Sequence, residues 1–207
     1  MNQKIIWKKI WQDGDKGGVN IFAKRSLVKI KNKTFKTLLD LGCGTGVDSL
    51  YFAKKGLDVT AVDFSGTAIK HLKRKLKQEK IKNITLKILD IKKINFPVKS
   101  FDIVYAHLSL DYFDNKTTLK VFNKIYKILK NGGLLFVKCK SVNDSLYGQG
   151  KKINEDMFIK RGHIRHFFTE KFMKTNLKKF KILSINKTLS LYHGYKSSFI
   201  EAVACKS

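Results

Sequence analysis

Three glycines and three aspartates are the residues of this sequence whose types and spacing first suggest chemistry. The stretch LLDLGCGTGVD, residues 38–48, places Asp40 two residues before the first of three alternating glycines. Asp63 comes 17 residues after Gly46, and Asp90 comes 27 residues after Asp63. Glycine lets the backbone approach a ligand closely, and carboxylates accept hydrogen bonds from hydroxyl and amino groups. The pattern therefore predicts a ligand-binding site.

The glycine loop departs from two common phosphate-binding patterns. A P-loop requires a lysine in register after its last glycine, and no lysine follows here. A dinucleotide-binding loop reads G-x-G-x-x-G, whereas here the third glycine comes one residue early and Val47 takes its expected place. Asp40 also brings negative charge next to the loop. The sequence therefore indicates a ligand that carries no phosphate at this point.

An alternation of strands and helices must position these residues. Apolar runs predict strands at 34–42, 57–65, 84–91, 100–110 and 134–141, and helical periodicity predicts intervening helices at 47–56, 65–80 and 115–130. Such an alternation implies crossover connections and a mostly parallel sheet with helices on both faces. Ligands of these sheets bind beyond the carboxyl ends of the strands, where the glycine loop lies.

The motif Asp40-Leu-Gly42-Cys-Gly44-Thr-Gly46 resembles the first motif of class I S-adenosylmethionine-dependent methyltransferases. Later motifs follow in the family's order, from VTAVDFS and LKILDI to FDIVYAHLSL and LKNGGLLFV, so the resemblance covers about residues 35–140. It implies an α/β, Rossmann-like, doubly wound fold with a mostly parallel seven-stranded sheet and a C-terminal antiparallel hairpin. It also implies S-adenosyl-L-methionine as the cofactor.

The resemblance also implies roles for individual residues. In this family an acid after the second strand binds the ribose hydroxyls, here Asp63, and one after the third strand contacts the adenine amino group, here Asp90. Adenosylmethionine has no phosphate and carries an ammonium and a sulfonium, which suits the charge of Asp40. The predicted cofactor-binding residues are Asp40, Gly42, Cys43, Gly44, Gly46, Asp63, Phe64, Asp90, Ile91 and His107.

The acceptor side is predicted from the end of the fourth strand and from the irregular segment 142–168. His107 and Asp111 are the candidate catalytic residues, although a packed histidine and a solvated turn are the plainer interpretations. Methyl transfer from a sulfonium needs alignment more than an indispensable side chain. The predicted substrate residues are Trp11, Tyr112, Tyr147, His163, Arg165 and His166.

No metal site is predicted. A His163 and His166 pair lacks a third ligand, and a magnesium site formed by Asp111 with Asn143 and Asp144 remains a weaker alternative.

At 207 residues the chain is expected to form one methyltransferase domain. We divide it into an N-terminal lid region (1–33), a cofactor-binding core (34–140), a substrate-side insertion (141–169) and a C-terminal helix with a hairpin (170–207). No apolar run is long enough to span a membrane, and no signal peptide is evident. Three cysteines far apart in the sequence indicate reduced thiols and a cytoplasmic protein. Oligomeric state is left open.

The net charge of +27 favours a polyanionic partner, but only four of the 43 basic residues are arginine. Lysine, asparagine and isoleucine share A/T-rich codons, so genome composition explains the charge equally well. We therefore expect a methyltransferase (EC 2.1.1.-) that acts on a small molecule. A methyltransferase of RNA or protein is the first alternative, and a non-catalytic adenosylmethionine-binding module is the second.

Overall fold

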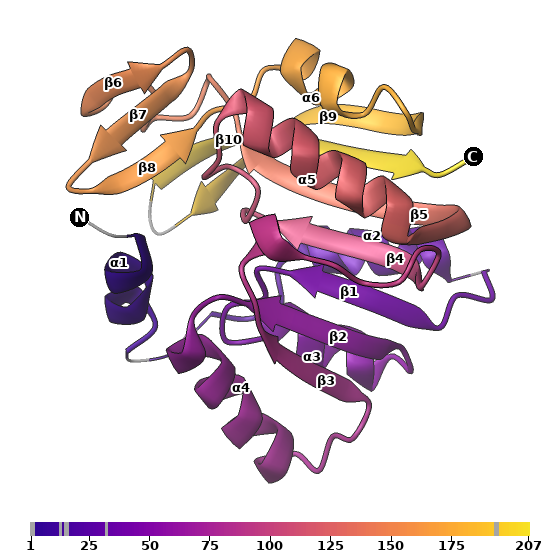
Figure 1. Cartoon of the computed structure of the whole chain (residues 1–207). Helices are drawn as coiled ribbons and strands as arrows, with labels where there is room; N and C mark the ends of the chain where they lie inside the picture. The colour runs from indigo at the N-terminus through magenta and orange to yellow at the C-terminus, as the bar shows by residue number, and fades with distance from the viewer. Residues whose placement is uncertain (1–2, 13, 15–16, 32, 193–194) are drawn as a thin grey trace.

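The computed structural model describes all residues except 1–2, 13, 15–16, 32 and 193–194. Its centre is a seven-stranded sheet in the order β3-β2-β1-β4-β5-β10-β9. Five parallel strands form one side: β1 (Thr37–Leu41), β2 (Asp58–Asp63), β3 (Ile84–Ile88), β4 (Phe101–His107) and β5 (Leu129–Lys140). The antiparallel hairpin of β9 (Lys181–Tyr192) and β10 (Tyr195–Cys205) completes the sheet beside β5. The fold predicted from the sequence is confirmed (Figure 1).

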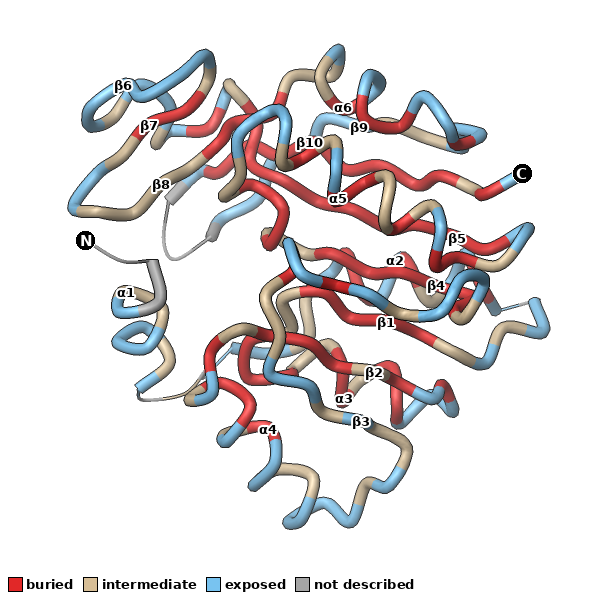
Figure 2. The backbone as a smooth tube through the Cα atoms, in the orientation of Figure 1, coloured by how far each residue is buried: buried red, intermediate tan, exposed pale blue. Residues whose placement is uncertain are grey.

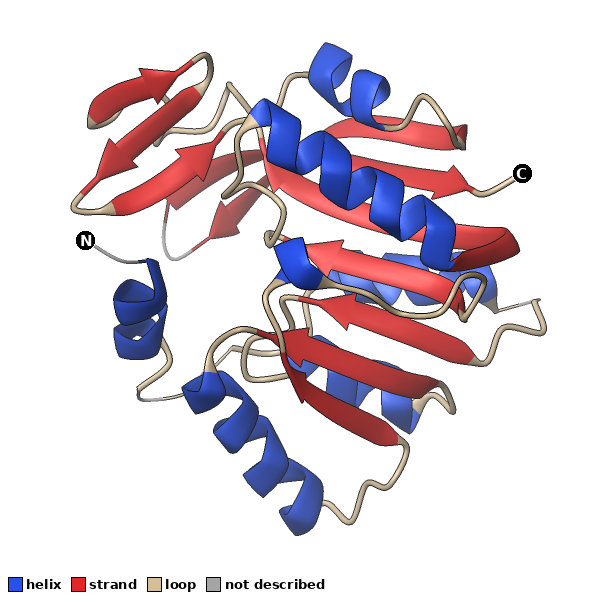
Figure 3. Ribbon diagram, in the orientation of Figure 1, coloured by secondary structure: helices blue, strands red, loops and turns tan. Residues whose placement is uncertain are grey.

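Helices cover both faces of the sheet (Figure 3). The helices are α1 (Gln3–Ile10), α2 (Ile21–Ile30), α3 (Val47–Lys54), α4 (Gly66–Gln78), α5 (Asn115–Ile128) and α6 (Glu170–Asn176). One apolar cluster contains Phe122 of α5 and Met173 of α6, whereas the other contains Phe22 of α2, Phe52 of α3 and Leu72 of α4. The central strands are consequently the most buried part of the molecule (Figure 2).

Two elements were not predicted from the sequence. Helix α2 precedes β1, and Asn20 caps it by accepting a hydrogen bond from the backbone N–H of Ala23 at 2.8 Å. The insertion folds into a separate antiparallel sheet of β6 (Lys151–Asn154), β7 (Met157–Lys160) and β8 (His163–His166). Within the described residues, no helix is both long and apolar enough to cross a membrane.

Helix α1 stands apart from the sheet faces. Figure 1 shows it beyond the arrowheads of β1, β2 and β4, between β8 and α4, and it contacts both of these elements. The carboxyl ends of the parallel strands, where ligands bind in this class of fold, therefore lie beneath α1.

Candidate active site

The glycine loop turns sharply between β1 and α3. Gly42, Gly44 and Gly46 have φ angles of 75°, 55° and 78°, a backbone region that other residues adopt at a cost. The backbone N–H groups of Gly42 and Cys43 donate to the Val62 carbonyl oxygen at 2.7 and 3.0 Å. The loop is therefore tied to the end of β2.

Close neighbours also require glycine at these positions. A β-carbon on Gly42 would lie 2.4 Å from Ser109 Cβ, and one on Gly46 would lie 2.4 Å from both δ-carbons of Leu72. Ser109 reaches Gly42 because the preceding residue, Leu108, bends the chain with a φ of 52°. A side chain at Gly44 would meet Trp11, with its β-carbon 2.9 Å from Cζ2 of the indole.

Asp63 lies at the end of β2 and connects two loops. One carboxylate oxygen accepts from the Gly44 N–H at 3.0 Å, and the other accepts from the Ser65 N–H at 2.8 Å. Burial raises the pKa of Asp63, and these two hydrogen bonds oppose the shift.

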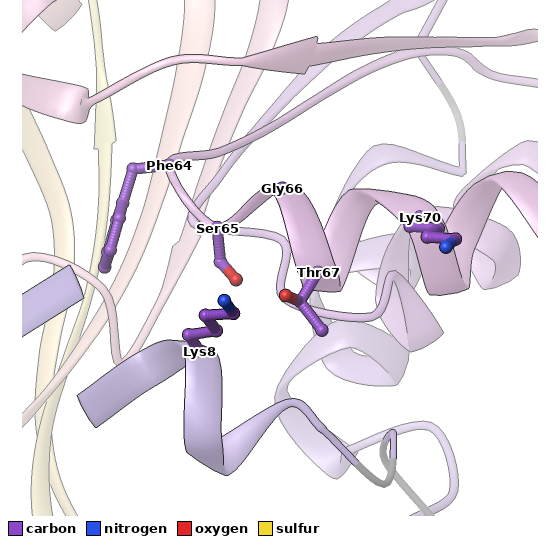
Figure 4. Close-up of a pocket in the computed structure, with 6 residues that line it drawn as sticks. All are labelled: Lys8, Phe64, Ser65, Gly66, Thr67 and Lys70. Carbon is purple, nitrogen blue, oxygen red and sulfur yellow. The ribbon is translucent and has the colours of Figure 1, made fainter. Parts of the chain in front are cut away.

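A cavity of about 520 Å³ opens beside Asp63, between α1 and the start of α4. It is lined by Lys8, Phe64, Ser65, Gly66, Thr67 and Lys70 (Figure 4). The lining offers one aromatic side chain, two hydroxyl groups and two ammonium groups, which suit a polar ring system such as a nucleoside.

Asp40 is buried behind the glycine loop, where it accepts a hydrogen bond from Ser49 Oγ at 2.5 Å. Burial raises the pKa of Asp40 to about 8, the Ser49 hydrogen bond lowers it, and the charges of Asp48 and Asp63 raise it further. Three carboxyl groups therefore surround the loop, which suits a cationic ligand.

The third predicted acid lies further out. Asp90 follows β3, caps a short 3₁₀ helix by accepting from the Lys92 N–H at 2.9 Å, and pairs with the Lys92 ammonium at 3.5 Å. Its neighbour Ile91 is buried, and its Cδ1 lies 3.5 Å from the β-carbon position of Gly42. Cys43, inside the loop, has a free thiol whose pKa is raised by burial.

His107 ends β4 and lies among aromatic rings. Its imidazole stacks near Phe22 and Tyr105, with ring centroids 6.1 and 6.4 Å away. Burial lowers the pKa of His107 to about 3, and the nearby charge of Lys138 contributes to the shift. His107 is therefore neutral at physiological pH.

Asp111 is 1% exposed and lies in the turn after β4. Its Oδ2 accepts a hydrogen bond from the Lys140 N–H at 3.3 Å, while its Oδ1 accepts none from the described residues. Burial raises the pKa of Asp111 to about 6, and hydrogen bonds and the charges of Lys140 and Arg165 oppose the shift. The carboxyl group can therefore exchange a proton near neutral pH.

Four aromatic side chains join α1 to the insertion. Trp7 stacks on Trp11 at 5.7 Å between ring centroids and meets Tyr112 and His163 edge-on at 5.4 and 5.2 Å. The Tyr112 and His163 rings stack at 5.5 Å. Arg165 donates to Nδ1 of His163 at 3.4 Å, and burial lowers the pKa of His163 to about 4. This aromatic cluster holds α1 over the site.

Comparison with known proteins agrees with this geometry. Residues 38–133 match the model of a methyltransferase domain. The fold superposes on a SAM-dependent methyltransferase from Methanosarcina mazei with a TM-score of 0.78, at 22% identity over 92% of this chain and 99% of that one. Residues 38–133 therefore form a methyltransferase domain by similarity, and the whole chain has the fold of S-adenosylmethionine-dependent methyltransferases.

Two further proteins show how far the similarity extends. An S-adenosylmethionine-dependent methyltransferase from Clostridium acetobutylicum superposes over the full length of both chains, with a TM-score of 0.73 and 20% identity. Phosphoethanolamine N-methyltransferase 2 of Caenorhabditis elegans is 29% identical over 127 residues, which are 61% of this chain and 27% of that protein. The chain spans less than half the length of the first curated relatives that it matches.

The residues of the methyltransferase domain fit adenosylmethionine. Asp63 comes directly before Phe64 of the cavity wall, and the carboxyl groups of Asp40, Asp48 and Asp63 near the loop suit a ligand that carries positive charge. Within the part of the chain that the structure describes, no group of three metal-ligating side chains comes together.

The predicted substrate residues separate into two groups. Trp11, Tyr112, His163 and Arg165 gather around α1 at the strand ends. Tyr147 instead donates to Asp156 at 2.7 Å and packs edge-on against Phe158 and Phe167 within the insertion. His166 is buried, donates from Nδ1 to the Phe113 carbonyl oxygen at 2.8 Å and contacts Phe172. These two side chains stabilise the insertion.

Sequence reasoning missed Ser109 and Phe22. The hydroxyl of Ser109 is buried, has no hydrogen-bond partner among the described residues, and lies against Gly42. Phe22 packs beside His107 because α2 covers that end of the sheet. Asn20, a typical N-cap residue before IFAKRSLVKI, was the available signal for α2.

Proposed function

We propose that the protein transfers the methyl group of S-adenosylmethionine to a small-molecule acceptor, which binds beneath α1 and the β6–β8 sheet. The observation that carries this proposal is the closure of the strand ends by α1. Trp7 packs against the stacked rings of Tyr112 and His163 on one side of the site. On the other side, the β-carbon position of Gly14 lies 3.4 Å from the His71 imidazole of α4. A covered site can enclose a small molecule but not a polymer, so the cover favours a small-molecule acceptor.

A named relative supports the same class of acceptor. The nematode protein is a phosphoethanolamine N-methyltransferase, whose name gives a small phosphorylated amine as its substrate. We extend to this chain only the size class of that acceptor.

The chain's own residues would align and deprotonate the acceptor. Adenosylmethionine supplies the methyl group and a sulfonium that leaves as a neutral thioether. Alignment in a site without water provides most of the rate acceleration of such an in-line displacement. Asp111 is the better proton acceptor of the two predicted catalytic residues, because its carboxyl group is ionised at neutral pH and its Oδ1 has a free lone pair.

His107 fits a different role. With its pKa lowered to about 3, its imidazole has little affinity for a proton at neutral pH. Its stacking with Phe22 and Tyr105 suits a rigid wall that excludes water at the end of β4.

A second candidate acceptor is RNA, because the net charge of +27 attracts polyanions. The exposed Lys151 and Lys152 of β6 place part of this charge on the surface of the insertion. We also propose a reducing compartment such as the cytoplasm, since Cys43, Cys139 and Cys205 are all free thiols.

A methyl-labelling assay distinguishes these functions. Purified protein is incubated with methyl-labelled adenosylmethionine and, separately, with a metabolite extract, total RNA or total protein. We expect label in the small-molecule fraction. We expect none with the Asp63→Ala control, which lacks the carboxylate predicted to bind the ribose. Label in RNA or protein would support the polymer alternative. Cofactor binding with no labelled acceptor would favour a binding module without catalysis.

A further inference from the structure

The aromatic face of α1 reaches the cofactor loop as well as the insertion. Trp7 and Trp11 are one helical turn apart, and the Trp11 N–H donates to the Trp7 carbonyl oxygen at 3.0 Å. Trp7 lies in α1 and Trp11 in the turn that follows it, and their indoles stack at 5.7 Å with an angle of 22° between their planes. They differ in what they contact next.

Trp11 lies directly against the glycine loop. Its Cζ2 and Cη2 atoms are 2.9 and 3.0 Å from the position that a β-carbon on Gly44 would take. The backbone N–H of the same Gly44 donates to the carboxylate of Asp63. The six-membered ring of the indole thus covers the backbone that holds the cofactor.

Carboxyl groups lie behind the loop. Asp40 and Asp63 are buried at the ends of β1 and β2, and Asp48 occupies the first turn of α3. A cationic ligand at the loop would stabilise the ionised forms of these groups and would also be attracted to the indole, because an aromatic face carries partial negative charge.

Adenosylmethionine and its product differ in that charge. When the acceptor forms a bond to the methyl carbon, the carbon–sulfur bond breaks and its electron pair stays on sulfur. The sulfonium becomes the neutral thioether of S-adenosylhomocysteine. We infer that Trp11 is a cofactor-binding residue whose indole stabilises the positively charged substrate form more than the neutral product form, so that charge selection favours exchange of product for substrate.

This inference depends on the assigned cofactor and is independent of the acceptor. It also gives Trp11 a role on the cofactor side of α1, whereas Trp7 contacts Tyr112 and His163 on the acceptor side. The sequence contains two tryptophans, so Trp7→Phe leaves Trp11 as a single fluorescent reporter.

The test measures dissociation constants for adenosylmethionine and adenosylhomocysteine by calorimetry, in the wild type and in the Trp11→Leu, Trp11→Phe and Trp7→Phe variants. We expect Trp11→Leu to weaken adenosylmethionine binding by about fivefold to thirtyfold, the range of a partly desolvated cation–π contact. Adenosylhomocysteine binding should weaken by a much smaller factor. Trp11→Phe retains an aromatic face, so its loss of adenosylmethionine affinity should lie between those of the wild type and Trp11→Leu. Trp7→Phe should keep the wild-type ratio of the two dissociation constants.

Fluorescence gives a second measurement on the same proteins. In the Trp7→Phe variant, adenosylmethionine should change the emission of Trp11 more than adenosylhomocysteine does. Melting temperatures show whether each variant is folded, and Trp11→Phe serves as the test if Trp11→Leu is not.

Three results would overturn the inference. Equal weakening of both ligands would show packing without charge recognition. Unchanged or tighter binding in Trp11→Leu would show that the indole only fills the space. Binding of neither ligand by the wild-type protein would remove the cofactor assignment itself, and the inference with it.

Discussion

Two buried aspartates lie at opposite ends of the neighbouring parallel strands β4 and β1 and have opposite environments. Asp102, at the amino end of β4, accepts hydrogen bonds from the Thr37 N–H at 2.9 Å, from Thr37 Oγ1 at 2.7 Å and from the Lys36 N–H at 3.1 Å. The ammonium of Lys130 lies 2.9 Å away. Desolvation opposes the shift, yet these partners lower the pKa of Asp102 to about 2. Asp102 is a fully partnered structural carboxylate.

Asp40, near the carboxyl end of β1, has one hydrogen bond from Ser49 and two neighbouring acids. Its pKa is raised to about 8, chiefly by burial. The difference shows that Asp102 at the amino ends is arranged for stability, whereas Asp40 at the carboxyl ends has few partners, and a bound cation would stabilise its ionised form.

Removing Asp63, the predicted ribose-binding residue, should produce the largest effect at the carboxyl ends. Asp63→Ala deletes the acceptor of the Gly44 and Ser65 N–H groups and the predicted partner of two hydroxyls. We expect adenosylmethionine affinity to fall by about 100-fold or more, since hydrogen bonds to a charged group contribute about 1.5–3 kcal/mol each. Calorimetric titration measures it, and normal binding would contradict the site assignment.

The corresponding change at the amino ends should reduce stability without affecting binding. Asp102→Ala leaves the Lys36 and Thr37 N–H groups without their acceptor, at a cost of about 2 kcal/mol in the free energy of unfolding. We expect the melting temperature to fall by about 4–8 °C. Cofactor affinity at a temperature well below the transition should not change. A loss of affinity similar to that of Asp63→Ala would remove the proposed division between the two ends.

The same residue predicts part of the acid sensitivity of the protein. A carboxyl group with a lowered pKa stabilises the fold above its unfolded-state pKa of 3.8, and this stabilisation is lost as the pH falls through about 2. The difference in stability between wild type and Asp102→Ala should therefore shrink over that interval, as measured by denaturant unfolding at several pH values.

The comparison also shows what the sequence can predict. The parallel strands were predictable because apolar runs alternate with amphipathic helices. Their bounds agree with the prediction to within a few residues except at β5, which begins at Leu129, within the segment predicted as the end of a helix. The positions of Asp40, Asp63 and the glycines were predictable because these residues lie at the end of a strand or just after it. Helix α2 was missed, and so was the β6–β8 sheet, whose segment shows no period and whose fold depends on packing by Phe158 and Phe167.

The acceptor side was less predictable for a physical reason. Asp111 and His166 are 55 positions apart, yet the His166 N–H donates to the Asp111 carbonyl oxygen at 2.9 Å. This contact brings β8 next to the turn after β4 and places His163 beside Tyr112. The position of Trp11 on Gly44 likewise depends on the path of α1. Such contacts between distant segments leave no local pattern in the sequence.

The raised pKa of Asp40 predicts that cofactor binding depends on pH. In the free protein Asp40 is protonated below about pH 8, and a bound cation favours its ionised form. Binding should therefore release a proton, and adenosylmethionine affinity should rise by a few-fold, at most about tenfold, per pH unit up to about pH 8. Calorimetry in two buffers of different ionisation enthalpy measures the proton release. Asp40→Asn should remove both the proton release and the pH dependence of affinity. If the variant kept that pH dependence, another group would be its cause.

Deleting one hydroxyl at each end should give the smallest pair of effects. Thr37→Val removes the Oγ1 hydrogen bond to Asp102, and we expect a loss of about 1 kcal/mol in unfolding free energy with unchanged cofactor affinity. Ser49→Ala removes the hydrogen bond that lowers the pKa of Asp40, so the pH at which affinity levels off should move upward. Affinity at pH 7 should then fall by a few-fold at most, because more of the protein must release a proton to bind. Denaturant unfolding and pH-dependent titrations of both variants test this pair. If Ser49→Ala changed only stability and Thr37→Val changed only affinity, the roles assigned to the two ends of the sheet would be reversed.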